Sequence, residues 1–261
     1  MLFDLYHILY MVISGLLTAG ILILAAFLIK KQKTKDLFLK FWAIITVVIH
    51  FSSIYYDYFI LKNSNPELEL SMFMPAFACN VCMWMLVIVA FARKDNKLIK
   101  LASTFLALGG IVCAVVGILL NETYDSDGMT TYDSIKGLLS HSTMLVGCIY
   151  LIVGKYVKIR VNSVLGVVFG LCVLLVDGLI INLTVKLFGL PSLNSMYLES
   201  IPFEKIPWLN TLTIGIIGVV VAFIIGVIVE FVFLKKEERW YTKIKKHFTR
   251  EEEISLKGEN K

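Results

Sequence analysis

Residues 7–40 read HILYMVISGLLTAGILILAAFLI followed by KKQKTKDLFLK, an uninterrupted apolar segment that ends in a cluster of five lysines. About 20 apolar residues in helical conformation are needed to cross the hydrocarbon core of a bilayer, and residues 7–29 reach that length. Basic residues beside a membrane helix favour the cytoplasmic side. The stretch therefore predicts a first transmembrane helix whose C-terminal end faces the cytoplasm.

Six further apolar segments repeat this pattern along the chain. Together, the seven predicted spans cover residues 7–29, 40–61, 70–92, 98–120, 135–154, 161–186 and 209–234. Basic residues gather in the first, third and fifth connections and in the tail. The only basic residues in the other connections and the N-terminus are Lys62, Lys136, Lys186 and Lys205. This alternation predicts an N-terminus outside the cell and a C-terminus in the cytoplasm.

The composition points to the same class of protein. The chain is 58 % hydrophobic and 17 % charged, which is typical of a polytopic membrane protein and not of a soluble domain. We expect an all-α fold in the cell membrane, with a seven-helix transmembrane domain over residues 1–236 and a basic cytoplasmic tail over 237–261. The excess positive charge lies in the predicted cytoplasmic segments and does not indicate a nucleic-acid partner.

Polar residues inside the predicted spans are the main chemical signal. Ionisable groups at membrane depth are costly and usually face the interior of a helix bundle. With a rise of about 1.5 Å per residue, Cys79, His141, His50 and Asp177 fall in the outer half of the bilayer or near its middle. This shared depth predicts a buried site in which a thiol lies beside an imidazole, the arrangement that yields a reactive thiolate. The alternative is a set of interhelical hydrogen bonds that only hold the bundle together.

Several segments resemble a known family. Residues 74–80, Met-Pro-Ala-Phe-Ala-Cys-Asn, resemble the Leu-Pro-Leu-His-Leu-Cys-Asn signature of the YwaF-like bacterial membrane proteins, which belong with eukaryotic transmembrane protein 164. His7 and His141 resemble histidines at the start of the first helix and in the fifth helix of that family. Residues 194–198, Asn-Ser-Met-Tyr-Leu, with Pro202 after them, are similar to an outer-loop stretch of the family.

The chain departs from this pattern at two places. Phe77 stands where the signature has a histidine, and residues 199–201, Glu-Ser-Ile, stand where the loop usually carries a basic residue. The first departure removes any role of that histidine. The second removes a cationic contact to a lipid headgroup.

The resemblance implies a seven-helix membrane fold and, from the eukaryotic branch, acyl transfer onto ether phospholipids. It implies that Cys79 is the nucleophile that carries the acyl group and that His141 is the base. Asn80 or Asn182 would donate to the oxyanion, while Asp177 or His50 would orient the His141 ring. The substrate loop would contain Asn194, Tyr197 and Pro202. The expected partner is a membrane phospholipid, with no cofactor and no metal.

A non-enzymatic function is the rival hypothesis. A seven-helix sensor, or a carrier of protons or small solutes, would use His50, His141 and Asp177 for binding or proton relay. In that case Asp177 would be essential and Cys79 dispensable, whereas the enzyme hypothesis predicts the reverse. The sequence does not give the oligomeric state.

Overall fold

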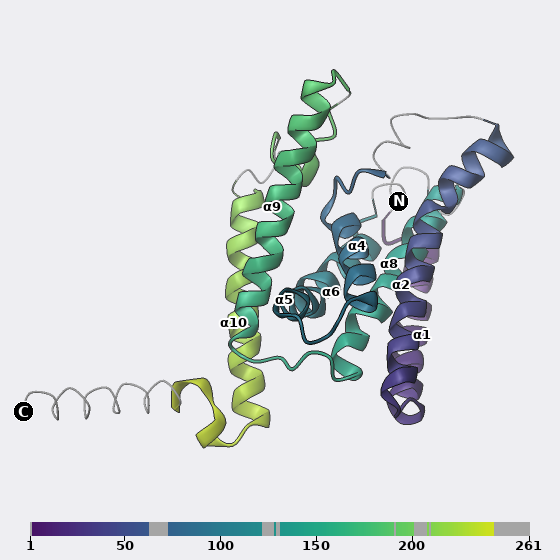
Figure 1. Ribbon diagram of the computed structural model, residues 1–261. Helices are drawn as coiled ribbons and strands as arrows, with labels where there is room; N and C mark the ends of the chain where they lie inside the picture. Colours follow the sequence, from purple (N-terminus) through teal and green to yellow (C-terminus); the bar gives the residue numbers. More distant parts are fainter. Residues whose placement is uncertain are drawn as a thin grey trace, which may run out of the picture.

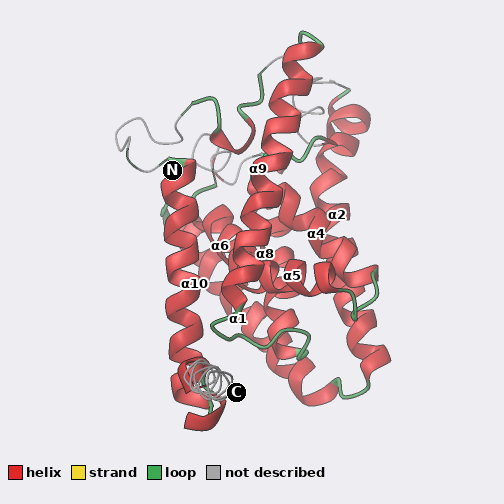
Figure 2. Cartoon of the chain, turned by 60° about the vertical axis from the view of Figure 1, so that its left-hand side comes forward, coloured by secondary structure: helices red, strands yellow, loops and turns green. Residues whose placement is uncertain are grey.

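The computed structural model describes residues 2–62, 73–121, 128, 131–190, 192–200, 208 and 210–242, and the regular elements among them are helices (Figure 1). The main helices are α1 Leu5–Leu28, α2 Gln32–Tyr55, α4 Ala78–Phe91, α8 Tyr132–Val153, α9 Ser163–Leu187 and α10 Thr211–Phe233. Another long helix consists of α5 Lys97–Phe105, a π-helical segment η2 Leu106–Gly110 and α6 Ile111–Leu119. The second view shows the same helical architecture, which confirms the all-α part of the prediction for the described residues (Figure 2).

Six helices among the described residues are long and apolar enough to cross a membrane, and each corresponds to a predicted span. They are Leu5–Leu28, Gln32–Leu61, Lys97–Leu119, Tyr132–Val153, Ser163–Leu187 and Thr211–Phe233. The second of these is α2 continued by the π-helical turns of η1, Tyr56–Leu61. It begins eight residues earlier than expected, so Lys33, Lys35 and Lys40 belong to a helix and not to a loop. The chain is a multi-pass membrane protein by the length and composition of these helices.

The third predicted span, residues 70–92, is helical only in part. Its helix α4 has 14 residues, which cover about 21 Å and fall short of the hydrocarbon core of about 30 Å. Pro75 accounts for the late start, because proline lacks an N–H group and disfavours helical geometry in the residue before it. Ala76 is fully buried although it is not helical. Irregular backbone at membrane depth is tolerated where protein covers it in this way. The structure therefore replaces the predicted third span with a short helix.

Helix α8 is at the centre of the bundle and packs against α1, α2, α4 and α6. Hydroxyl groups link it to its neighbours: the Ser142 Oγ lies 2.7 Å from the hydroxyl of Tyr10 and 2.8 Å from that of Ser14. On another face, the Thr46 hydroxyl of α2 donates to Thr143 at 3.1 Å. Such contacts hold helices together in lipid, because the hydrophobic effect does not drive apolar helices together in an apolar solvent. They fix the helix that carries His141.

Many large side chains on the outside of the bundle are apolar. Leu16 and Phe27 on α1 are 69 % and 72 % exposed, and Phe233 at the end of α10 is 77 % exposed. Water would make apolar surface of this extent unfavourable, whereas lipid tails cover it at no cost. The outward faces therefore suit a hydrocarbon environment.

The Gly-x-x-x-Gly spacing of Gly166 and Gly170 predicts close helix packing, and the structure confirms it. A Cβ atom on Gly170 would lie 2.0 Å from the Phe105 ring of α5, and one on Gly166 would lie 2.6 Å from Thr104. Helix α9 thus approaches α5 more closely than any larger residue would allow. This contact joins the α9–α10 pair to the rest of the bundle.

Glu230, near the end of α10, is the only carboxylate among the fully described buried side chains. Its two oxygens accept hydrogen bonds from the backbone N–H groups of Val161, at 3.0 Å, and Trp240, at 2.7 Å. Glu230 therefore fixes the segment that enters α9 and the segment that leaves α10. Most of the predicted tail, from residue 243 onward, lies outside the described residues.

Candidate active site

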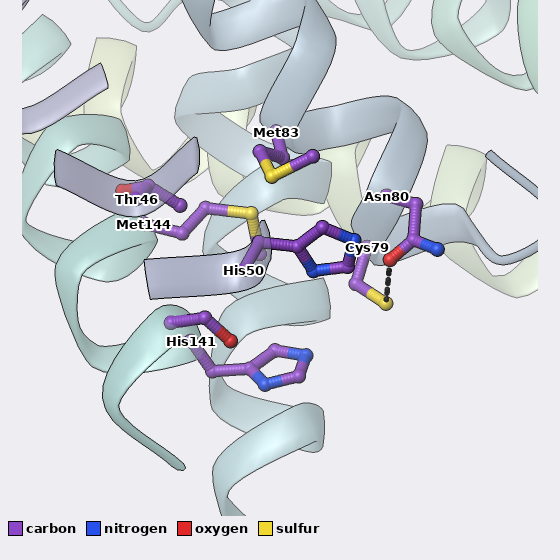
Figure 3. A pocket seen from close by; sticks show the side chains of 8 residues that line it. Thr46, His50, Cys79, Asn80, Met83, His141 and Met144 are labelled. Carbon is purple, nitrogen blue, oxygen red and sulfur yellow. Dashed lines mark hydrogen bonds between the residues drawn. The ribbon is translucent and has the colours of Figure 1, made fainter. Parts of the chain in front are cut away.

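Cys79 is the second residue of α4. Phe77 is extended, with φ −116° and ψ 152°, and the helix begins at Ala78. The Cys79 thiol donates to the Asn80 side-chain oxygen, with the sulfur 3.5 Å from Oδ1 (Figure 3). The free N–H groups at the start of a helix carry partial positive charge, which favours a thiolate and a developing oxyanion. The sequence analysis expected Cys79 deep within a longer helix and so did not predict this position.

Four of the predicted site residues line one cavity. His50 from α2, Cys79 and Asn80 from α4, and His141 from α8 share it (Figure 3). Its remaining walls are Thr46, Met83, Ser140 and Met144. The cavity has a volume of about 20 Å³, which is room for a single water molecule. Three helices that are distant in sequence thus bring a thiol and two imidazoles to one place.

The protonation of His141 follows from its hydrogen bond. Its Nδ1 lies 2.7 Å from the backbone carbonyl of Gly137, one turn earlier on α8. A carbonyl oxygen can only accept, so Nδ1 carries the proton of the neutral ring and Nε2 has the free lone pair. Gly137 therefore orients the imidazole, the role that the sequence analysis gave to Asp177 or His50.

Gly117 on α6 provides the space for the His141 ring. A Cβ atom at this position would lie 2.1 Å from Cδ2 and 2.2 Å from Nε2 of His141. Contacts this short are sterically forbidden, so any larger residue would move the ring. Nothing in the sequence pattern of residues 98–120 distinguishes Gly117 from the other glycines of that span.

Lys136 is a site residue that the sequence analysis did not predict. It is 9 % exposed, and its Nζ lies 3.5 Å from Asp133, one turn earlier on α8. It also lies close enough to Asp57 and Cys79 for direct electrostatic interaction. In the sequence, the signal for this position is a lysine within a predicted apolar span, five residues before His141. The charge pattern of the connections predicts only a loop cation at this position.

The loop over residues 192–200, which we predicted as an outer loop, is attached to the segment that leads into α4. The Asn182 side chain of α9 accepts from the Ser195 N–H at 2.7 Å and donates to the Ser195 carbonyl at 3.2 Å. Ser195 in turn donates its hydroxyl to the Ala76 carbonyl at 2.8 Å, and the Met196 N–H donates to the same oxygen at 2.9 Å. Asn182 does not line the Cys79 cavity. Its amide instead fixes Ser195, which in turn holds Ala76 just before α4 and Cys79.

Two of the three predicted loop residues complete this arrangement. Asn194 accepts hydrogen bonds from the backbone N–H groups of Glu199 and Ser200, both at 3.0 Å, which closes a tight loop. The Tyr197 ring lies 5.9 Å from the ring of Phe77, the residue just before α4. Pro202, the third, lies outside the described residues.

The chain was compared with known protein families. A sequence model of the TMEM164 family matches residues 2–239. The chain belongs to the TMEM164 family. Searches of curated proteins and of solved structures found no match.

His7, one of the positions that carry the resemblance to the TMEM164 family, has a structural role here. Its ring is fully buried, and Nε2 donates to the Ile118 carbonyl at 2.8 Å while Nδ1 accepts from the Phe3 N–H at 3.0 Å. The bond to Ile118 fastens the start of α1 to the end of α6, and the bond from Phe3 holds the ring in place. His7 thus helps to position α6, the helix on which Gly117 faces the His141 ring.

Asp177 is the predicted site residue that the structure places apart from the others. It lies on α9 and does not line the Cys79 cavity. Within the described part of the chain, its buried Oδ2 has no hydrogen-bond partner. The structure thus brings together four of the six predicted catalytic and supporting residues, while Asp177 and Asn182 lie outside the cavity.

The other cysteines have different surroundings. Cys82 is fully buried and hydrogen-bonds with Cys113, and Cys148 is also fully buried, whereas Cys172 is exposed on α9. Among the described residues, no group of three His, Cys, Asp or Glu side chains is arranged to hold a metal ion. Cys79 thus differs from these cysteines in that it lines the cavity described above together with His50 and His141.

Proposed function

We propose that this chain is a membrane acyltransferase that moves a fatty-acyl group between phospholipids through a thioester on Cys79. The observation that carries the proposal is the cavity shared by the Cys79 thiol and the His141 imidazole, whose Nε2 is the unprotonated nitrogen. Family membership supports a multi-pass membrane protein. The support for acyl chemistry is the arrangement of the thiol and the imidazole.

The first half-reaction forms the thioester. His141 Nε2 accepts the proton of the Cys79 thiol, and the thiolate sulfur attacks the carbonyl carbon of a phospholipid ester. The negative charge on the carbonyl oxygen is stabilised by the N–H groups at the start of α4, by the Asn80 amide and by the positive charge of Lys136. Collapse of this intermediate breaks the ester C–O bond, and His141 returns the proton to the departing alkoxide. The products are a lysophospholipid and acyl-Cys79.

The second half-reaction reverses these steps with a different alcohol. The hydroxyl of a second lysophospholipid gives its proton to His141 Nε2 and attacks the thioester carbonyl carbon. The C–S bond breaks, the proton passes to the sulfur, and the thiol of Cys79 is restored. No oxidant or external energy source is needed, because an ester is exchanged for another ester.

The substrate must reshape the cavity before it can bind. A space of about 20 Å³ does not hold an acyl ester. Two of its walls are Met83 and Met144, and methionine side chains are unbranched and adapt readily to new shapes. We expect the acyl chain to enter from the lipid between helices as these side chains move.

Covalent acyl capture tests the proposal. The purified full-length protein, carrying Cys172→Ala to remove the exposed thiol, would be incubated with phosphatidylcholine bearing an alkyne-tagged acyl chain. We expect label on Cys79 that neutral hydroxylamine releases, no label in Cys79→Ser, and about 100-fold slower labelling in His141→Ala, the usual loss for a general base.

Two further variants separate the enzyme from the carrier hypothesis. Asp177→Asn should label at the wild-type rate, because Asp177 does not line the cavity, whereas a proton carrier would depend on that carboxylate. Absence of label in a folded wild-type protein, with several phospholipid donors tried, would refute the acyltransferase proposal.

A further inference from the structure

A second cavity lies at the basic end of the bundle, where α1 and α8 end and α2 begins (Figure 1). Its volume is about 240 Å³, against about 20 Å³ for the cavity at Cys79. Ala25 and Ile29 from the end of α1 and Val153 from α8 form the apolar part of its lining. It shares no lining residue with the candidate active site.

Three lysines from three different segments also line this cavity. They are Lys30 after α1, Lys35 in the first turn of α2 and Lys155 after α8. Lys30 donates to the Ala26 carbonyl at 2.7 Å, and Lys35 donates to the Gly154 carbonyl at 3.3 Å. The C-terminal end of a helix carries about half a negative charge, so two helix ends do not balance three ammonium groups. The cavity therefore has net positive charge.

The carboxylate of Asp36 is near the lysines but is not part of the cavity lining. Its Oδ1 accepts hydrogen bonds from the Tyr156 hydroxyl at 2.6 Å and from the Gln32 amide at 3.0 Å. Burial and the hydrogen bond to Asp36 raise the pKa of Tyr156, so its hydroxyl remains protonated and continues to donate. These donors occupy Oδ1 and leave the carboxylate charged, but one negative charge outside the lining, added to two helix ends, still leaves the three lysines in excess.

Tyr150 provides an independent sign of a missing ligand. It lines the cavity and is only 1 % exposed, and within the described residues its hydroxyl has no hydrogen-bond partner. Its ring is held in place by Phe38 and Tyr156, at centroid distances of 4.4 and 6.3 Å. A buried hydroxyl without a partner is unfavourable. A ligand oxygen in the cavity would supply the acceptor.

The backbone beside the cavity is also constrained. Lys155 has φ +67°, a left-handed conformation that is strained for a residue with a side chain. It follows Gly154, where a Cβ atom would lie 2.8 Å from the Tyr156 ring and 2.9 Å from the Tyr150 carbonyl. Strain of this kind tends to persist at ligand sites, where the surrounding contacts hold it.

We propose that this cavity binds the phosphate of an anionic phospholipid headgroup from the leaflet at the basic end of the bundle. Phosphate oxygens are acceptors that match lysine N–H groups and a phenol O–H. Basic pockets between membrane helices commonly bind such headgroups. The acyl chains would extend over Phe27 and Leu28 at the end of α1, which are 72 % and 75 % exposed. This lipid site is independent of the proposed acyl transfer.

Calorimetric titration of the detergent-purified full-length protein tests the ligand class. The ligands would be short-chain phosphatidate, short-chain phosphatidylcholine, glycerol phosphate and inorganic phosphate. We expect phosphatidate to bind at least about tenfold more tightly than each of the others, because only it combines a headgroup of net negative charge with acyl chains. Equal binding of glycerol phosphate would show that the ligand is a soluble phosphate ester and would overturn the lipid assignment.

Matched variants test the location. The double variant Lys30→Gln with Lys155→Gln should bind phosphatidate about tenfold more weakly, and Tyr150→Phe about threefold more weakly. The control, Lys31→Gln with Lys33→Gln, removes the same charge from exposed residues of the same end that do not line the cavity, and should change binding less than about twofold. Equal losses in both double variants, unchanged binding in Tyr150→Phe, or no binding of phosphatidate to the wild type would each overturn the proposal.

Discussion

Gly117 gives the candidate site its shape by the absence of a side chain. In Gly117→Ala, the new methyl group would lie about 2 Å from the His141 ring and force it out of its position. We expect acyl capture by Cys79 to fall about 100-fold, as for the loss of a general base. The labelling assay with the alkyne-tagged phospholipid measures this rate.

Gly20→Ala on α1 is the matched control for that substitution. No atom lies within 4 Å of a Cβ built on Gly20, so the extra methyl group should leave labelling unchanged. Full activity in a folded Gly117→Ala protein would show that His141 does not act from the position described here.

Lys136 is expected to make Cys79 reactive. In Lys136→Met, the cation near the sulfur disappears while Asp133 and Asp57 remain, so the thiolate becomes less favourable. We expect the alkylation rate of Cys79 by iodoacetamide to fall about tenfold, which corresponds to about one unit of thiol pKa. Mass spectrometry of the labelled peptide measures the rate.

Two comparisons make this prediction specific. Lys136→Arg keeps the charge and should retain most of the wild-type rate. Alkylation of the exposed Cys172 on α9 should be the same in every variant, which controls for reagent and detergent. A Cys79 rate that is indifferent to Lys136→Met would remove Lys136 from the mechanism.

At the scale of elements, the outer loop and α4 behave as one unit through Asn182, Ser195 and Ala76. In Asn182→Leu, both hydrogen bonds to Ser195 are lost and the buried backbone groups of the loop have no partner. We expect a loss of about 2 kcal/mol in the free energy of unfolding and slower acyl capture, since the start of α4 would be less fixed. Unfolding in mixed micelles and the labelling assay measure the two effects.

Thr184→Val is the control on the same helix. The Thr184 hydroxyl is exposed and bonds only to Ile180 of its own helix, so its removal should cost little stability. If Asn182→Leu lowered stability without any effect on labelling, the clamp would be structural and would not position Cys79.

Hydropathy and charge predicted most of the helices, because six of the seven segments follow the length rule for membrane spans. They did not predict where α4 begins. The residues before Ala78 are as apolar as the helix itself, so hydropathy does not reveal that the helix starts only after Pro75. Of the residues grouped by depth, His50, Cys79 and His141 line one cavity in the structure and Asp177 does not. Depth along a helix does not predict which face a residue occupies. The proximity of Lys136 to Cys79 could not be predicted, because a lysine at the boundary of a predicted span is typical of a loop.

The arrangement of the whole molecule bears on how many times the chain crosses the membrane. In both views the N-terminus lies toward the upper end of the bundle, while α10 ends at the lower end (Figures 1 and 2). The end of α4 lies with the basic end: the Lys40 ammonium of α2 is 5.0 Å from the Phe91 ring, and Lys94 lies 5.5 Å above the Tyr156 ring. We therefore predict that α4 and the irregular segment before it cross the membrane together, because the helix alone is too short.

Seven crossings require the two ends of the chain to lie on opposite sides of the membrane, whereas six would place them on the same side. Because the lysines of the first loop and those after α8 lie at one end, we predict that this end is cytoplasmic and that the N-terminus is outside. Alkaline phosphatase, active only outside the bacterial cytoplasm, and a fluorescent protein that matures in the cytoplasm would be fused to each terminus in turn. The phosphatase should be active only at the N-terminus and the fluorescent protein bright only at the C-terminus. Cytoplasmic signals at both termini would mean that the segment with α4 enters and leaves the membrane on the same side. Cys79 would then belong to a re-entrant segment and not to a transmembrane crossing.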